Sequence, residues 1–423
     1  MAFLVESNPD PDNSYARLIR NQKYAIIPSF QLESGETLSK CPIAYKTWGS
    51  LNENRDNVDV SDWWSPLIGP GKAFDPRHFF IFCGNVFGSP YGSASPLTKN
   101  PNTGRRYAGE FPQTTIRDDV RAHKLVLDAL GVKSVATVIG GSMGGMATLE
   151  WPLCTPSNFV KNIIPIATAA DHSAWGISWV ETQRQCIYSD PKFLDGRYEP
   201  TPEGQPSAGL AAARMIAMLT YRSCTSFDNR FGRRPLRELN KPKDPPLDLP
   251  RTESPAIEPA HGRSRRPTRD LSFSAQGYLR YQGKKFISRF DANCYLHITY
   301  KMDSHDVAYG RTKDLGDRAL SDVLSRVPFG ALVIGVETDA LFLPEQQERL
   351  VACLPGASLS VLESSDGHDG FLLEFDQLDA LIQTKLRSDL PHLYATTNKF
   401  EETFDLDITD PSGRSLTGEV ERW

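Results

Sequence analysis

The sequence contains no long apolar run and no recognisable targeting segment. In its 423 residues no stretch of about 18 apolar residues occurs, so we expect no membrane-spanning helix. Residues 1–6 (Met-Ala-Phe-Leu-Val-Glu) include no basic segment followed by an apolar core, which argues against a signal peptide. We therefore expect a cytoplasmic protein that has no membrane partner.

Paired cysteines, an excess of basic charge and metal-binding motifs are also absent. The seven cysteines are scattered and form no C-x-x-C pair, a pattern that favours reduced thiols over a disulfide framework. The net charge of −5 argues against a nucleic-acid partner. No H-E-x-x-H motif and no glycine loop typical of dinucleotide binding is found. We therefore expect no metal ion and no bound cofactor.

The apolar pattern predicts alternating strands and helices. Short apolar runs predict strands at residues 24–32, 41–48, 78–83, 135–139, 159–167, 330–336 and 358–362. Helical spacing predicts helices after Thr115 and at residues 344–354 and 370–386. This alternation is typical of an α/β fold with a mostly parallel sheet flanked by helices.

The pattern changes along the chain and predicts how the chain is divided. We expect a loose N-terminal segment at residues 1–20 and an α/β core formed by residues 21–170 and 311–392. Residues 171–310 have helical spacing, at 178–187, 209–221 and 277–291, without parallel strands, which indicates a helical lid inserted into the core. Within the lid, residues 234–270 are rich in proline and charge and are predicted to be disordered. Residues 393–423 read as a polar tail.

A serine bracketed by glycines lies between a predicted strand and a predicted helix. Residues 140–144 (Gly-Gly-Ser-Met-Gly) match the nucleophile-elbow pattern G-x-S-x-G, in which a sharp turn exposes the serine hydroxyl. The glycines allow the chain to fold back closely, and the amides at the helix N-terminus can stabilise an oxyanion. We therefore predict that Ser142 is a nucleophile.

An acid and a histidine follow in the order that this pattern requires. Asp339 comes just after the strand predicted at 330–336, and His368 follows the strand predicted at 358–362 in a glycine-flanked loop. A serine nucleophile needs such a base, and the base needs a carboxylate that fixes its tautomer. Two alternatives remain: Glu337 is a rival acid, and Asp339 could instead cap the following helix.

Several motifs together resemble the homoserine O-acetyltransferases of the α/β-hydrolase superfamily, and the fungal branch in particular. The resemblance covers about residues 24–390. It is carried by residues 115–123, 140–146 and 367–372, and by residues 183–191, 278–283 and 290–295. The resemblance implies the α/β-hydrolase fold and an enzyme of methionine biosynthesis.

The resemblance also implies substrates and further site residues. In such enzymes Ser142 would take an acetyl group from acetyl-CoA and pass it to L-homoserine in a ping-pong reaction. The backbone N–H of Met143 would stabilise the oxyanion, Arg214 would bind the carboxylate of homoserine and Asp369 its ammonium group. The resemblance implies a homodimer. Other acceptors remain open, namely serine or a secondary-metabolite alcohol such as deacetylcephalosporin C, as does an esterase.

One departure from the family concerns the second oxyanion donor. In the family an apolar strand and a short loop follow the region of Leu51, whereas here Asn57 and Val58 run directly into Asp59. About a dozen residues are absent, so we expect the loss of a central strand and of one oxyanion amide. Two interpretations are open: an error in the predicted sequence, such as a skipped exon segment, or an impaired or catalytically inactive protein.

Overall fold

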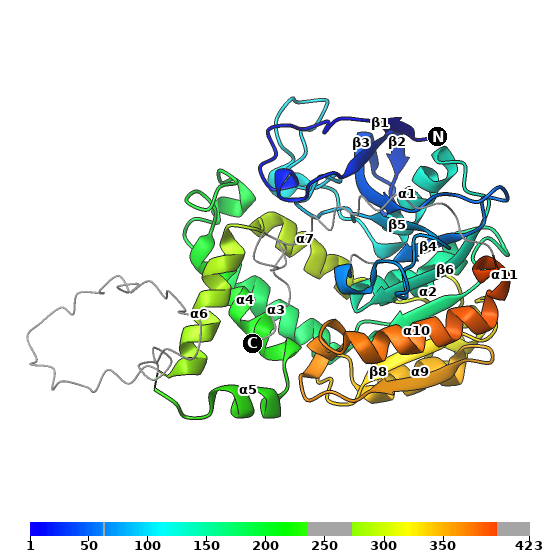
Figure 1. Cartoon of the computed structure of the whole chain (residues 1–423). Helices are drawn as coiled ribbons and strands as arrows, with labels where there is room; N and C mark the ends of the chain where they lie inside the picture. The colour runs from blue at the N-terminus through cyan, green and yellow to red at the C-terminus, as the bar shows by residue number, and fades with distance from the viewer. Residues whose placement is uncertain (62–63, 236–272, 396–423) are drawn as a thin grey trace, which may run out of the picture.

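The computed structural model describes residues 1–61, 64–235 and 273–395 (Figure 1). The insert predicted to be disordered at residues 234–270 lies outside these ranges except for its first two residues. The predicted polar tail at 393–423 lies outside them beyond residue 395.

A sheet of nine strands organises the described part of the chain. The strand order is β1-β2-β3-β5-β4-β6-β7-β8-β9, with antiparallel pairing from β1 to β5 and parallel pairing from β5 onward. The strands are β1 (Phe3–Val5), β2 (Lys23–Gln31), β3 (Thr37–Trp48), β4 (Val58–Ser61), β5 (Phe80–Gly84), β6 (Val135–Gly141), β7 (Ile163–Ile166), β8 (Leu332–Val336) and β9 (Ser358–Leu362). The predicted α/β fold with a mostly parallel sheet is confirmed.

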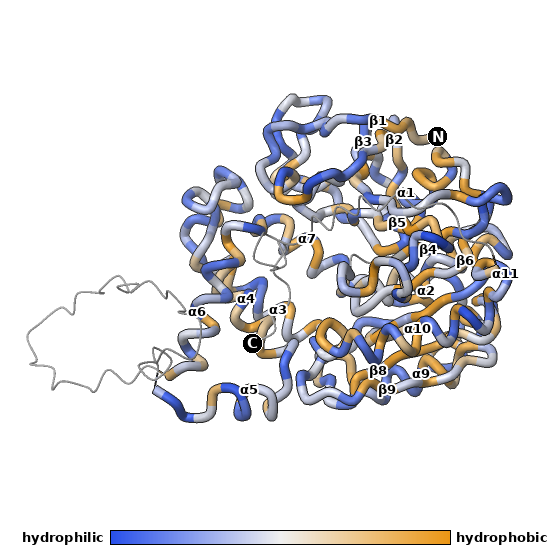
Figure 2. The backbone as a smooth tube through the Cα atoms, in the orientation of Figure 1, coloured by the Kyte–Doolittle hydropathy of each residue, from blue (hydrophilic) through white to orange (hydrophobic). Residues whose placement is uncertain are grey.

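Helices cover both faces of the sheet, and apolar residues are concentrated between the layers (Figure 2). One face is covered by α1 (Ile116–Ala129), α2 (Met143–Cys154), α8 (Gly316–Leu324) and α9 (Pro344–Cys353). The other is covered by α10 (Phe375–Asp389) and α11 (Pro391–Tyr394). As predicted, Thr115 caps α1, and it forms a capping box with Asp118. Within the described ranges, no helix is both long and apolar enough to cross a membrane.

The N-terminal segment is ordered, and the expectation that residues 1–20 are loose is wrong. β1 pairs with β2, and the side-chain amide of Asn13 donates to the carbonyl of Pro90 at 2.9 Å. The ring of Tyr15 is buried. A polar sequence thus gains order because a few of its side chains are buried against the core.

The lid enters after β7 and leaves before β8, and its helices gather beside the sheet (Figure 1). It consists of α3 (Ala174–Tyr188), α4 (Ser207–Tyr221), α5 (Cys224–Phe231), α6 (Ser274–Ile287) and α7 (Ala292–Asp303). Three of these helices were expected from spacing, whereas α5 and α7 were not. In α7 the buried face includes Lys301, whose ammonium group lies 2.6 Å from the carboxylate of Asp119. Apolar spacing does not reveal a helix that buries such a charged residue.

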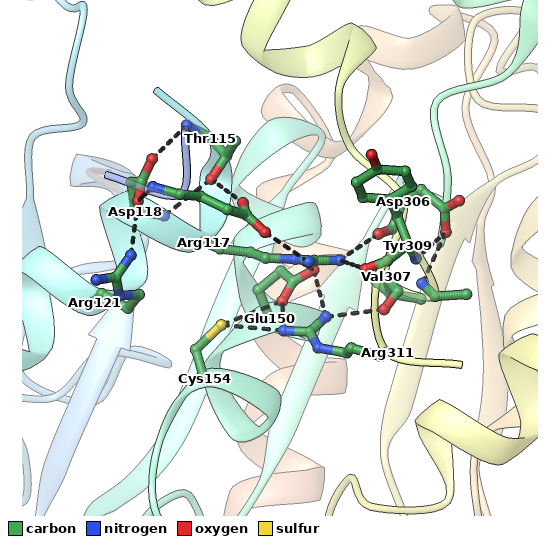
Figure 3. A network of polar contacts seen from close by, with 12 residues as sticks. Thr115, Arg117, Asp118, Arg121, Glu150, Cys154, Asp306, Val307, Tyr309 and Arg311 are labelled. Atoms are coloured by element: carbon green, nitrogen blue, oxygen red, sulfur yellow. Dashed lines mark hydrogen bonds and ion pairs between the residues drawn. The ribbon is translucent and has the colours of Figure 1, made fainter. Parts of the chain in front are cut away.

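A buried cluster of charges fixes the point where the lid rejoins the core. Figure 3 shows Arg117 of α1 and Arg311 converging on Glu150 of α2. The guanidinium groups lie 3.1 Å and 2.6 Å from the Glu150 carboxylate, which is fully buried. Arg117 also donates to the backbone carbonyls of Asp306 and Tyr309 at 2.7 Å and 2.9 Å. The cluster therefore ties the returning chain to the helix that follows Ser142.

A strand does occupy the centre of the sheet, so the predicted loss of that strand is wrong. Val58 and Val60 pair in parallel with β5 and β6, and both point into the core. They alternate with Asp59, and pairing on both sides with β5 and β6 makes this short segment the strand β4. The strand buries Asp59 completely, and neither carboxylate oxygen of Asp59 has a hydrogen-bond partner among the described residues. This burial is energetically unfavourable. The hydroxyl of Thr137, its register neighbour on β6, lacks one as well.

Candidate active site

Ser142 lies at the sharp turn between β6 and α2. Its backbone has φ 55° and ψ −120°, a conformation that L-residues rarely adopt. The turn is tight, because a Cβ on Gly140 would lie only 2.2 Å from the carbonyl oxygen of Gly144. The Ser142 N–H donates to the carbonyl of Ile166 at 2.9 Å. These contacts hold the serine at the carboxyl end of the parallel strands.

His368 and Asp339 meet Ser142 at this edge of the sheet. The Nε2 atom of His368 lies 2.9 Å from the Ser142 Oγ atom, and its Nδ1 atom lies 2.7 Å from Asp339 Oδ2. With the Nδ1 proton donated to Asp339, Nε2 accepts from the serine hydroxyl. The three side chains thus form the hydrogen-bonded chain that a serine nucleophile requires.

Asp339, and not Glu337, is the acid in contact with the histidine. The Asp339 Oδ1 atom accepts hydrogen bonds from the backbone amides of Leu341 and Phe342 at 2.8 Å and 2.9 Å. Glu337 is exposed, and the residue at the N-cap of α9 is Leu343. Asp339 is therefore fixed for contact with His368 and does not cap the helix.

The environment of His368 favours its protonated form. Burial alone would lower its pKa, but the charge of Asp339 and the hydrogen bond to Asp339, together with the charge of Asp369, raise it above the usual value. The rings of Phe342 and Phe371 lie 5.3 Å and 5.2 Å from the imidazole. A histidine with a raised pKa is a stronger base for the serine proton.

Met143 occupies the position expected for an oxyanion donor. It is the first residue of α2, so its N–H belongs to the amides that have no carbonyl partner within the helix. The second donor was expected to be lost with the missing loop. The residues that directly follow β4, 62–63, lie outside the described ranges, and that loss remains a prediction.

Arg214 and Asp369 lie on opposite sides of the junction between the lid and the core. Arg214 belongs to the lid helix α4, and Asp369 belongs to the loop that carries His368. Arg214 is buried on α4, with its guanidinium 4.8 Å from the ring of Phe286, and its charge lowers the pKa of Asp369. Asp369 is buried next to His368 and forms an ion pair with Arg222 at 2.8 Å. Sequence reasoning did not identify Arg222, because its partner is far away in the chain and no local motif marks it.

No metal centre was found in the described part of the chain. No group of three histidine, cysteine, aspartate or glutamate side chains there could hold a metal ion. A cavity of about 620 Å³ lies at the opposite, amino-terminal end of the parallel strands, where Lys161, Lys385 and His392 contribute to its lining. The arrangement at Ser142 is therefore the candidate active site.

The parallel sheet, the serine at a strand-to-helix turn and the Asp339–His368–Ser142 chain define a serine enzyme of the α/β-hydrolase fold. The family model described as alpha/beta hydrolase fold matches residues 50–375. The crystal structure of a homoserine O-acetyltransferase from Bacillus anthracis superimposes with a TM-score of 0.71, at 22% identity over 90% of this chain and 99% of that one. Esterase E22 gives a TM-score of 0.70 at 22% identity, with coverage of 86% and 99%. These two likenesses concern the fold.

Curated sequences identify the family within this fold. The homoserine O-acetyltransferase of Schizosaccharomyces pombe is 44% identical and covers 97% of this chain and 95% of its own length. The Saccharomyces cerevisiae enzyme gives the same identity and coverage. This chain belongs to the homoserine O-acetyltransferase family. The alignment with the S. pombe sequence spans 474 positions, more than the 423 residues of this chain, so the aligned region contains positions that this chain lacks.

Proposed function

We propose that this enzyme transfers an acetyl group from acetyl-CoA to the side-chain hydroxyl of L-homoserine, in methionine biosynthesis. The observation that carries the proposal is the hydrogen-bonded chain from Asp339 through His368 to Ser142, in a member of this family. No bound cofactor takes part, and the reaction needs only the two substrates.

The first half of the reaction forms an acetyl-enzyme. As the Ser142 Oγ atom attacks the thioester carbonyl carbon, His368 Nε2 takes the hydroxyl proton. The oxygen of the tetrahedral intermediate carries the negative charge, which the N–H of Met143 stabilises. The carbon–sulfur bond then breaks, and the leaving thiolate of coenzyme A receives the proton from His368.

The second half transfers the acetyl group to the acceptor. The hydroxyl of homoserine attacks the carbonyl carbon of acetyl-Ser142 while His368 takes its proton. The bond to Ser142 Oγ breaks, and His368 returns the proton to that oxygen. Asp339 stabilises the imidazolium that forms in each half-reaction.

Two further residues orient the acceptor in this proposal. The guanidinium group of Arg214 binds the carboxylate of homoserine in a bidentate manner, and the carboxylate of Asp369 binds its ammonium group. The lid excludes water, which otherwise competes with homoserine for the acetyl-enzyme.

An assay of free thiol tests the proposal. Purified protein is mixed with acetyl-CoA, and thiol release is measured with and without L-homoserine. We expect release to depend on homoserine, and O-acetyl-L-homoserine to accumulate in step with the thiol. Normal turnover by a Ser142→Ala variant would contradict the mechanism.

Assays with several acceptor alcohols determine which of them is the preferred substrate. L-Serine and deacetylcephalosporin C are compared with L-homoserine at equal concentration, and we expect the highest kcat/KM for homoserine. A higher kcat/KM for another alcohol would keep the chemistry and replace the acceptor. Acetate release at the same rate with and without any acceptor would identify an esterase instead.

A further inference from the structure

A corner of the lid is docked on the loop that carries His368. Arg222 lies between α4 and α5, and its side chain is almost completely buried. Its NH1 group lies 2.8 Å from Asp366 Oδ1, and its Nε atom lies 2.8 Å from Asp369 Oδ2. The next residue, Ser223, donates through its hydroxyl to the carbonyl of Ser365. One arginine of the lid therefore contacts carboxylates on both sides of His368.

The backbones of the corner and the loop are also in close contact. Gly367, in the 3-10 helix η6 (Gly367–Leu372), has a φ of +70°. A Cβ at this position would lie 2.6 Å from the Ser223 nitrogen and 2.8 Å from the Arg222 carbonyl carbon. Any side chain here would push the corner away from the loop. The close contact between the two backbones, which Gly367 permits, therefore places Arg222 next to Asp369.

Burial and the charge of Arg222 shift the pKa of the Asp369 carboxyl in opposite directions. Burial raises the pKa of the Asp369 carboxyl, and the charge of Arg222 is the strongest influence that opposes this shift. His368 and Arg214 oppose it less. An acid that binds an ammonium group must carry a negative charge. The ion pair with Arg222 involves the Oδ2 atom of Asp369.

From these contacts we propose that Arg222 is a positioning residue that holds the Asp369 carboxylate for the ammonium group of the amino-acid acceptor. The inference rests on the proposed function, in which Asp369 binds that ammonium group. Arg222 itself touches neither the acetyl group nor the reacting hydroxyl. Its loss is therefore expected to weaken recognition of the acceptor's amino group and to leave the chemistry at Ser142 intact.

The test compares two acceptors that differ only in the amino group. L-Homoserine and 4-hydroxybutanoate are assayed with the wild-type protein and with Arg222→Gln. We expect kcat/KM of the variant for homoserine to fall by about 10- to 100-fold, which corresponds to the typical contribution of a hydrogen bond to a charged group. Transfer to 4-hydroxybutanoate and the rate of Ser142 acetylation by acetyl-CoA are expected to stay within about threefold of wild type.

Two further variants separate positioning from a structural role. Arg222→Lys keeps a positive charge and is expected to recover part of the preference for homoserine. Asp366→Asn removes the other ion pair of the same arginine but leaves the contact between Arg222 and Asp369, so it is expected to keep the preference. If Arg222→Gln does not fold, Arg222→Lys alone is expected to show a smaller loss confined to homoserine.

Each result decides for or against the proposal. An equal loss for both acceptors, or an unchanged ratio of the two kcat/KM values, would overturn the role of Arg222. A wild-type protein that forms acetyl-Ser142 but uses neither acceptor would instead contradict the proposed function, so the two failures are distinguishable.

Discussion

Replacing Asp59 with valine is expected to stabilise the protein, and more strongly as the pH rises. Asp59 lies on the central strand β4, is fully buried and has no hydrogen-bond partner among the described residues. Burial raises its pKa well above the usual value. Valine suits a strand and resembles Val58 and Val60 on either side.

The size of the effect has a constant part and a part that depends on pH. An unpaired buried polar group costs about 1–3 kcal/mol, and Asp59→Val removes that cost. In the unfolded chain the carboxyl loses its proton near pH 3.9, whereas the folded protein keeps it up to the raised pKa. The wild type therefore loses stability as the pH rises through this window, by about 1.4 kcal/mol per pH unit. Above the raised pKa this dependence ends.

Urea unfolding at several pH values between 5 and about 8 measures both parts. The free energy of unfolding of Asp59→Val is expected to exceed that of the wild type at each pH, and the gap is expected to widen with pH up to the raised pKa of Asp59. The matched variant Asp59→Asn cannot titrate but keeps an unpaired polar group, so it is expected to remove the pH-dependent part alone. A variant Asp59→Val that is no more stable than wild type at any pH would refute the reasoning.

Three further predictions concern the site and the lid. His368 must be neutral to act as a base, and its pKa is raised. We therefore expect kcat/KM to rise with pH, with a midpoint above the usual histidine pKa of about 6.5. A midpoint below that value would contradict the assignment. Asp339→Asn is expected to lower kcat by about 10⁴-fold in steady-state assays, and a loss of less than tenfold would count against its role. Glu150→Gln removes the buried carboxylate that Arg117 and Arg311 share, although Arg117 keeps its ion pair with Glu33. It is expected to cost about 3–5 kcal/mol in urea unfolding and to raise the ratio of acetate to O-acetylhomoserine. The control Asp128→Asn, at an exposed ion pair with Lys124, is expected to cost less than about 1 kcal/mol, and equal costs for the two variants would argue against the buried cluster.

Features that depend on residues close together in the chain could be predicted from the sequence. The turn at Ser142 needs particular residues within a few positions, and Gly140 meets a steric demand that any side chain would violate. Asp339 and His368 could be predicted because each follows a short apolar strand in a fixed order. The contact of His368 with both partners agrees with that prediction.

Other features depend on contacts that no local pattern reveals. β4 exists because β5 and β6 lie on both sides of Val58–Ser61, and the pairing tolerates a buried Asp59. Arg222 contacts carboxylates 144 or more positions away in the chain, and it precedes a helix like many polar residues. The N-terminal segment gains order from β2 and from Pro90, which its own composition does not indicate.

Mass spectrometry of the intact protein and of its proteolytic peptides, after incubation with acetyl-CoA alone, tests the central claim most directly. The account predicts a single added acetyl group on the peptide that contains Ser142, absent from a Ser142→Ala variant and removed when L-homoserine is added. An unmodified Ser142, or an acetyl group that homoserine does not remove, would contradict it.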